Sequence, residues 1–201
     1  MNYYIVNNTM FEENGWVYGE EKGVIKTGKA IKCLECGNYL TSLEWLPPLE
    51  ITLSKGQIGD VIFGTFNHFI ISDKFKDIYE NNGFSGVISF EPVKIYQKNN
   101  LVNKSYFYPR INLCEIDTDI EKSEIVFSGK KQCSKCQKAG RGIKKMKGLY
   151  LIGDKKIKDN IFCIKMLPGD IIVTNKFRMA TKELSNLSYT LAENYKPNWL
   201  I

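Results

Sequence analysis

The chain has 201 residues, of which 43% are hydrophobic and 12% aromatic, so it can build a folded core and lacks the composition of a disordered protein. No apolar run approaches the roughly 20 residues of a membrane-spanning helix, which excludes that class of membrane protein. The first residues, MNYYIVNNTM, lack the basic and apolar segments of a secretory signal. We therefore expect a cytoplasmic protein that makes no contact with a membrane.

The predicted elements are mostly short β-strands. The first includes Ile5 and Val6, and β-favouring runs punctuated by Gly, Asn and Pro follow at 61–63, 69–71, 93–96, 111–116, 124–127, 148–152 and 161–166. Helix is predicted in two places only. Ser72 is a good N-cap for a helix that stops at Asn82-Gly83, and Thr174 or Asn175 caps the second helix. This pattern predicts an α+β fold with mostly antiparallel strands and few short helices.

A faint internal repeat runs through the chain. The motif Cys33-Leu34-Glu35-Cys36 recurs one hundred positions later as Cys133-Ser134-Lys135-Cys136. Three further pairs keep the same order, namely 59–62 with 169–172, 72–75 with 174–177, and 84–87 with 184–187. We therefore predict a single compact domain over residues 1–201, built from two similar halves of about 1–105 and 106–201.

The two Cys-x-x-Cys motifs predict a metal site. In a reducing cytosol disulfides are disfavoured, whereas two such motifs offer four thiolates to one tetrahedral Zn²⁺. Such an ion is structural, since a catalytic zinc keeps an open position. We predict one Zn²⁺ per chain, bound by Cys33, Cys36, Cys133 and Cys136. The other two cysteines, Cys114 and Cys163, are predicted to be small buried apolar residues.

The spacing of the motifs leaves an alternative open. Between Cys36 and Cys133 lie 96 residues, far more than separate the two cysteine pairs of an ordinary zinc ribbon. If the halves pack about a pseudo-two-fold axis, equivalent motifs meet at that axis. Otherwise each motif is an unrelated reduced pair. Gly37 follows the first motif and favours a knuckle, whereas Gln137 stands at the equivalent place in the second.

All of the net positive charge, +6, comes from one segment. Between Gly129 and Gly148 there are eight basic residues and no acidic one. The segment is a candidate partner-binding surface, comprising Lys130, Lys131, Lys135, Lys138, Arg141, Lys144, Lys145 and Lys147. Nucleic acid is a less favoured partner than protein, because no aromatic residue is interleaved with the charges. The lysines could also serve only to offset the charge of a four-thiolate zinc site.

Catalytic motifs are missing from the sequence. There is no phosphate-binding loop, nucleophile elbow or zinc-protease motif, and the one histidine, His68, lies in an apolar, strand-like run. Most acid–base and nucleophile schemes then lack their base. We therefore expect a protein that is not an enzyme.

The two cysteine motifs and their spacing resemble the bacterial double-CXXCG motif family. The resemblance is carried by Cys33, Cys36 and Gly37, by Cys133 and Cys136, and by the segment 70–95. Members of that family are described as immunity proteins of toxin–immunity systems. The resemblance implies a protein that binds and neutralises a cognate toxin, with the zinc as scaffold. A zinc-ribbon protein that binds nucleic acid is the alternative.

Overall fold

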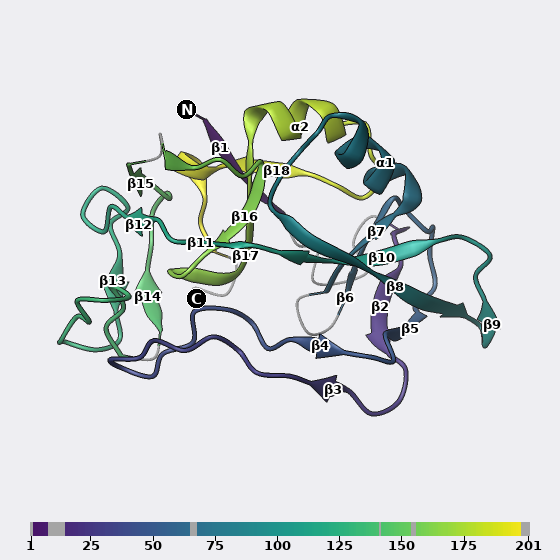
Figure 1. Cartoon of the computed structure of the whole chain (residues 1–201), viewed down its shortest axis with the longest axis horizontal. Helices are drawn as coiled ribbons and strands as arrows, with labels where there is room; N and C mark the ends of the chain where they lie inside the picture. The colour runs from purple at the N-terminus through teal and green to yellow at the C-terminus, as the bar shows by residue number, and fades with distance from the viewer. Residues whose placement is uncertain (1, 8–14, 65–67, 141, 154–155, 198–201) are drawn as a thin grey trace.

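A computed structural model describes residues 2–7, 15–64, 68–140, 142–153 and 156–197, which form a six-stranded barrel beside a five-stranded sheet (Figure 1). In the barrel, strands are hydrogen-bonded in the order β10-β7-β6-β2-β5-β8, and β8 pairs with β10 to close the ring. Strand β9 extends β8 as a hairpin. The bounds are β2 Tyr18–Glu21, β5 Glu50–Leu53, β6 Val61–Gly64, β7 His68–Ser72, β8 Val87–Gln97, β9 Asn100–Leu101 and β10 Tyr106–Ile111.

The barrel interior is an apolar core. Ile51, Ile62, Ile70 and Ile95 are all at most 2% exposed and pack together there. These isoleucines fit because β-branched side chains suit a pleated surface, and alternate residues of a strand face the same side.

The five-stranded sheet joins the two ends of the described chain. Its order is β11-β16-β17-β1-β18, so the first strand lies between two strands from the end of the sequence. Tyr3 pairs with Thr174, and Tyr4 pairs with Leu191. The bounds are β1 Tyr3–Val6, β11 Leu113–Cys114, β16 Ile161–Ile164, β17 Leu167–Thr174 and β18 Tyr189–Leu191.

Three two-stranded ladders stiffen the long connections. They pair β3 with β4, β12 with β15, and β13 with β14. Their bounds are β3 Lys26–Thr27, β4 Trp45–Leu46, β12 Asp117–Thr118, β13 Val126–Phe127, β14 Ile143–Lys145 and β15 Leu151–Ile152. The α+β prediction with mostly antiparallel strands is confirmed, because the parallel pairings among the described strands are β11–β16, β2–β6 and β5–β8.

Both predicted helices are present, at the junction of the barrel and the five-stranded sheet. Helix α1 (Asp73–Asn81) follows β7, and α2 (Asn175–Thr181) follows β17. The Ser72 hydroxyl accepts from the Phe75 N–H and the Thr174 hydroxyl from the Phe177 N–H, both at 3.3 Å. The rings of Phe75 and Phe177 are fully buried and their centroids lie 5.8 Å apart. A short 3₁₀ helix, Ala192–Asn194, follows β18. None of the described helices is long and apolar enough to cross a membrane.

The loops after the two helices dock reciprocally. The Ser185 N–H after α2 donates to the Asp60 carboxylate at 2.8 Å, at the start of β6. The Ser85 N–H after α1 donates to the Asn160 side-chain oxygen at 3.2 Å, at the start of β16. Asp60 and Asn160 are one hundred residues apart and each also bonds the hydroxyl of a helix cap, Ser72 and Thr174 respectively.

This hydrogen bonding corrects one of the sequence matches. The sequence aligned Gly59-Asp60 with Gly169-Asp170, but Asp60 precedes β6 whereas Asp170 lies inside β17, which runs directly into α2. The structural counterpart of Asp60 is Asn160. The match by residue identity was wrong because an Asp and an Asn accept the equivalent backbone hydrogen bond in the two places. The larger claim of two similar halves stays a prediction, since one side closes into a barrel and the other stays open.

Replacing Asp60 tests this junction. Its carboxylate accepts from the Ser185 N–H and hydroxyl at 2.8 Å and lies 3.5 Å from the Lys74 ammonium. Burial opposes ionisation, but these donors and Lys74 hold the pKa of Asp60 below its usual value. We expect Asp60→Ala to lower the free energy of unfolding by about 2–4 kcal/mol, measured in urea at pH 7. Asp60→Asn should cost less, because Asn160 makes the equivalent contacts. Equal losses for both variants would contradict this account.

Candidate metal centre

Each cysteine motif forms a knuckle with the same backbone hydrogen bonds. In the first, the Gly37 N–H donates to the Cys33 carbonyl at 2.9 Å and the Cys33 N–H to the Asn38 carbonyl at 2.8 Å. In the second, the Gln137 N–H donates to the Cys133 carbonyl and the Cys133 N–H to the Lys138 carbonyl, both at 2.9 Å. This turn places both thiols of a motif on one side.

The tertiary structure brings all four cysteines together. Their sulfur atoms lie within 4.8 Å of one another, with Cys33 Sγ 3.7 Å from Cys133 Sγ and Cys36 Sγ 3.5 Å from Cys136 Sγ. A tetrahedral Zn²⁺ with Zn–S bonds of 2.3 Å requires sulfur atoms about 3.8 Å apart. The four cysteines could therefore hold one metal ion, although 96 residues separate the motifs.

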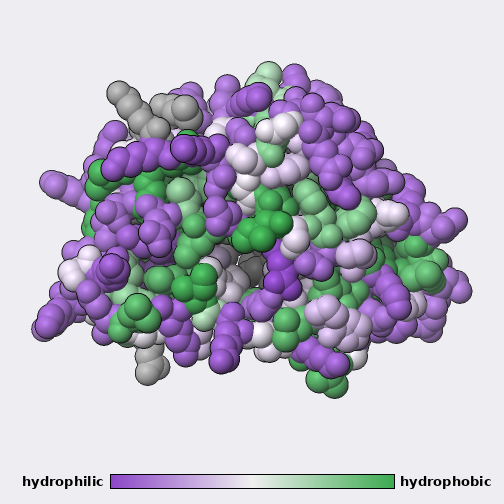
Figure 2. All heavy atoms as spheres, viewed as in Figure 1, coloured by the Kyte–Doolittle hydropathy of each residue, from purple (hydrophilic) through white to green (hydrophobic). Residues whose placement is uncertain are grey.

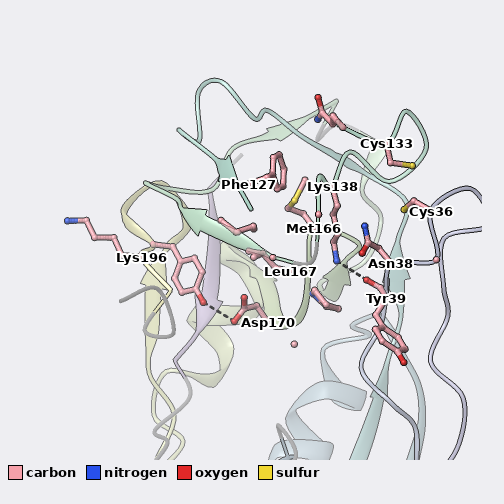
Figure 3. A pocket seen from close by; sticks show the side chains of 18 of the residues that line it. Cys36, Asn38, Tyr39, Phe127, Cys133, Lys138, Met166, Leu167, Asp170 and Lys196 are labelled. Carbon is pink, nitrogen blue, oxygen red and sulfur yellow. Dashed lines mark hydrogen bonds between the residues drawn. The ribbon is translucent and has the colours of Figure 1, made fainter. Parts of the chain in front are cut away.

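Side chains also link the knuckles. The Ser134 hydroxyl donates to the Glu35 carboxylate at 2.9 Å, and this bond is the main cause that lowers the pKa of Glu35. In the other direction, the Lys138 ammonium donates to the Tyr39 carbonyl at 2.8 Å (Figure 3). Glu35 has no role in the sequence prediction, because a residue between two cysteines gives no sign of which loop it will contact.

The local hydrogen bonds make the thiols unequal before metal binds. The Cys36 N–H lowers the pKa of Cys33 to about 7, whereas burial raises the pKa of Cys136 to about 12. A metal ion must therefore displace protons to be bound by all four sulfurs, so metal affinity falls as the pH falls. Burial also lowers the pKa of Lys138, while the thiolates of Cys136 and Cys36 raise it. The charge of a four-thiolate site therefore helps to keep this lysine protonated.

Gln137 takes the place that glycine has in the first knuckle, and its contacts show how the second knuckle tolerates it. Its φ is +64°, close to the +71° of Gly37, so the backbone turns in the same left-handed conformation. The Gln137 side chain accepts from the Thr118 N–H at 3.0 Å and donates to the Thr118 carbonyl at 3.4 Å. It pairs with the backbone at β12 as a neighbouring strand would. These two bonds offset the cost of the left-handed conformation for a residue with a Cβ.

Two substitutions separate these effects. Gln137→Ala loses both bonds and keeps the backbone strain, so we expect it to destabilise the metal-loaded protein by about 1–2 kcal/mol. Gln137→Gly loses the bonds but relieves the strain, so it should be about 1 kcal/mol more stable than the alanine variant. Urea unfolding of both variants in excess Zn²⁺ measures the difference. An alanine variant as stable as the glycine variant would show that the strain is negligible.

The basic segment divides into three groups. Lys145 and Lys147 each lie 3.2 Å from the Glu124 carboxylate, and Lys138 is occupied within the knuckles. Lys130, Lys131, Lys135 and Lys144 are exposed and form no ion pair within the described part of the chain. Arg141 lies outside the described residues. That this segment binds a partner stays a prediction.

The remaining predicted residues lie away from the knuckles. Cys114 and Cys163 are half-buried in β11 and β16, where Leu113 pairs with Cys163, and neither belongs to the metal cluster. His68 begins β7, as a strand residue should, and its side chain lies outside the described residues.

Comparisons with known proteins leave the family open. No protein-family model matches the chain, and a search of curated proteins gave no match. The resemblance to the double-CXXCG family therefore rests on the motifs, their spacing and the segment 70–95 alone. The geometry of the four cysteines stands independently of it.

Proposed function

We propose that the four cysteines bind one structural Zn²⁺. Four thiolates complete a tetrahedral shell, so such an ion keeps no open position for substrate or water. The observation in support is the cluster of four sulfurs, with two sulfur–sulfur distances, 3.7 and 3.5 Å, close to those of a zinc–thiolate tetrahedron. Soft thiolate ligands favour zinc over magnesium or calcium. A reducing cytoplasm, where we place the protein, would keep these thiols available.

We also propose that the chain consists of two similar halves related by a pseudo-two-fold axis through this ion. Each close sulfur pair joins cysteines one hundred positions apart. The reciprocal contacts of Ser85 with Asn160 and of Ser185 with Asp60 follow the same relation. In this arrangement the metal fastens one half to the other.

The surface around the first knuckle supports a protein partner. Of the eleven large apolar side chains that are exposed in the described chain, six fall between Val24 and Leu43, the segment that carries this knuckle. Leu34, at the tip between the two cysteines, is 98% exposed. This segment runs along the lower edge of the view in Figure 1, and apolar side chains interrupt the polar surface along that edge in Figure 2. Apolar side chains gathered on a surface are typical of protein interfaces.

Together these features lead to the function proposed for the chain. We propose a zinc-stabilised immunity protein that binds a cognate toxin through the segment 24–43 and neutralises it. The observation that carries a protein partner is the concentration of exposed apolar residues on the segment 24–43, which includes the first knuckle. The resemblance to the double-CXXCG family suggests that the partner is a toxin. Binding and occlusion need no catalytic residues.

The product of the neighbouring gene provides the test. We expect it to form a complex with the zinc-loaded chain and to arrest growth unless the chain is co-expressed. Leu34→Asp should weaken the complex by at least about tenfold, since a central apolar contact is lost. Leu101→Asp is the matched control, because Leu101 is 61% exposed on β9, outside this segment. Absence of a complex at micromolar concentrations overturns the toxin partner, and equal effects of the two variants overturn the assigned surface.

One observation favours nucleic acid as a second candidate. Lys130, Lys131, Lys135 and Lys144 are exposed and unpaired within the described chain, so they are available to phosphates. Binding of a random-sequence duplex that weakens steeply between 50 and 200 mM salt would support this function. Absence of binding at 50 mM salt would remove it.

A further inference from the structure

A cleft of about 1820 Å³ separates the knuckles from the five-stranded sheet (Figure 3). One wall is the first knuckle and the residues that follow it, from Cys36 to Tyr39. The opposite wall is the start of β17 together with residues 194–196, which begin at the last residue of the 3₁₀ helix. Residues 36–39 belong to the exposed apolar segment 24–43, so the cleft opens beside that segment.

The cleft has an apolar part and, on the side of the sheet, an acidic group. Phe127, Ile143, Met166 and Leu167 line the apolar part. Asp170, from β17, also lines the cleft, and its Oδ1 accepts from the Tyr195 hydroxyl at 2.8 Å (Figure 3). Its other carboxylate oxygen makes no hydrogen bond within the described structure.

No cation of the described chain neutralises Asp170. Neither Lys138 nor Lys196, which also line the cleft, forms an ion pair with it. Burial raises its pKa to about 6, and the Tyr195 hydroxyl bond only partly opposes this. A carboxylate in such surroundings gains from a cation supplied from outside, because the attraction is stronger where water is excluded.

The size of the cleft indicates whether a small molecule or a peptide segment supplies that cation. Pockets for small molecules measure about 300–1,000 Å³. This cleft has 1820 Å³ and places apolar side chains beside Asp170. An extended peptide segment with apolar residues on either side of a cationic one matches this shape and chemistry.

We propose that the cleft receives a segment of the partner protein whose lysine or arginine side chain pairs with Asp170 while neighbouring apolar side chains pack on Phe127 and Ile143, both half-exposed in the lining. The proposal rests on the proposed function and names the chemistry by which the partner is recognised. Asp170 confers specificity, since a segment with a neutral residue at that position leaves the carboxylate without a partner. Tyr195 is a positioning residue, because its hydroxyl fixes the carboxylate.

Two peptide probes test the charge. The acetylated and amidated pentapeptide GLKLG should bind the zinc-loaded chain on the order of tenfold more tightly than GLQLG, measured by calorimetry at pH 7.5. Asp170→Asn should bind both peptides equally. Glu193→Gln removes the same charge from an exposed position outside the cleft and should keep the preference. Equal binding of both peptides to the unmodified chain overturns the proposal. It is also overturned if a single lysine, acetylated at its α-amino group and amidated at its carboxyl group, binds as tightly as GLKLG.

The pH dependence of GLKLG binding gives a second measurement. The other titratable groups at the cleft or near Asp170 are Glu35, Tyr39, Lys131, Lys138, Lys196, Tyr195, Cys36, Cys133 and Cys163. Affinity should rise with pH through the ionisation of Asp170, near pH 6, and Asp170→Asn should lose that step. Tyr195→Phe removes a bond that favours the carboxylate, so the step should move to higher pH. A step that persists in Asp170→Asn overturns the assignment.

The toxin assay separates this inference from the proposed function. If the unmodified chain and Asp170→Asn neutralise the toxin equally well, the role of Asp170 fails while the immunity function stands. If the peptides bind as expected but the neighbouring gene product forms no complex, the cleft assignment stands and the toxin partner fails.

Discussion

Removal of the metal ion should lower the midpoint of thermal unfolding by about 10 °C. A ligand present at a thousand times its dissociation constant stabilises the folded state by about 4 kcal/mol, and a domain of this size loses about 2–4 °C for each kcal/mol. The expected loss is at least this large, because zinc–thiolate sites bind far more tightly. Calorimetry with and without a chelator measures the change. Elemental analysis should find one zinc per chain.

Cysteine variants provide the controls for that result. Cys33→Ser and Cys136→Ser should unfold at the lower temperature without chelator, and the chelator should then have no further effect. Cys114→Ala and Cys163→Ala lie outside the cluster and should keep one zinc per chain. An unfolding temperature that the chelator leaves unchanged contradicts the structural role, and two zinc ions per chain contradict a shared site.

Asp170→Asn should make the protein more stable at neutral pH. The pKa of this carboxyl is raised from 3.8 to about 6 in the folded state, so above pH 6 the folded chain carries an ionised group that the unfolded chain solvates better. Asparagine removes this cost of up to about 3 kcal/mol and can still accept from the Tyr195 hydroxyl. The gain should be complete above pH 6, shrink as the pH falls, and vanish below 3.8. Urea unfolding at pH 4 and pH 7.5 measures it.

The same carboxylate then links stability with binding. Glu193→Gln, at an exposed position, should leave the free energy of unfolding within about 0.5 kcal/mol of the unmodified chain at either pH. If Asp170→Asn destabilises the protein at pH 7.5, the carboxylate has a structural role instead. A more stable variant that loses its preference for GLKLG would show stability given up for recognition.

Local chemistry made much of the fold predictable. A hydroxyl followed by a short amphipathic run identified both helices, because the N-cap bond joins residues only three apart, as in Ser72 with Phe75. The cysteine motifs identified the metal cluster for a similar reason. Only four of the cysteines occur in Cys-x-x-Cys motifs, and each knuckle is a local turn. This holds even though the two knuckles lie far apart in the sequence.

Other features depend on contacts that no local pattern specifies. The barrel closes because β8 pairs with both β5 and β10, and the short apolar runs gave no sign of this. The role of Gln137 in the second knuckle could not be predicted, since its partner Thr118 lies in a separate strand. The cleft was missed for the same reason. Asp170 and Tyr195 are ordinary residues until the chain brings them together around an apolar space.

The position of β1 has a consequence for the order of folding. Its neighbours in the sheet, β17 and β18, are synthesised much later than β1 itself, with Tyr4 paired to Leu191. Strand β1, which lies between these two strands, can therefore pair only after both have left the ribosome. Pairing across such a sequence separation is slow, and the unpaired strand exposes its backbone meanwhile. The same holds for the metal centre, because the first knuckle can meet the second only after the chain between Cys33 and Cys133 has been made.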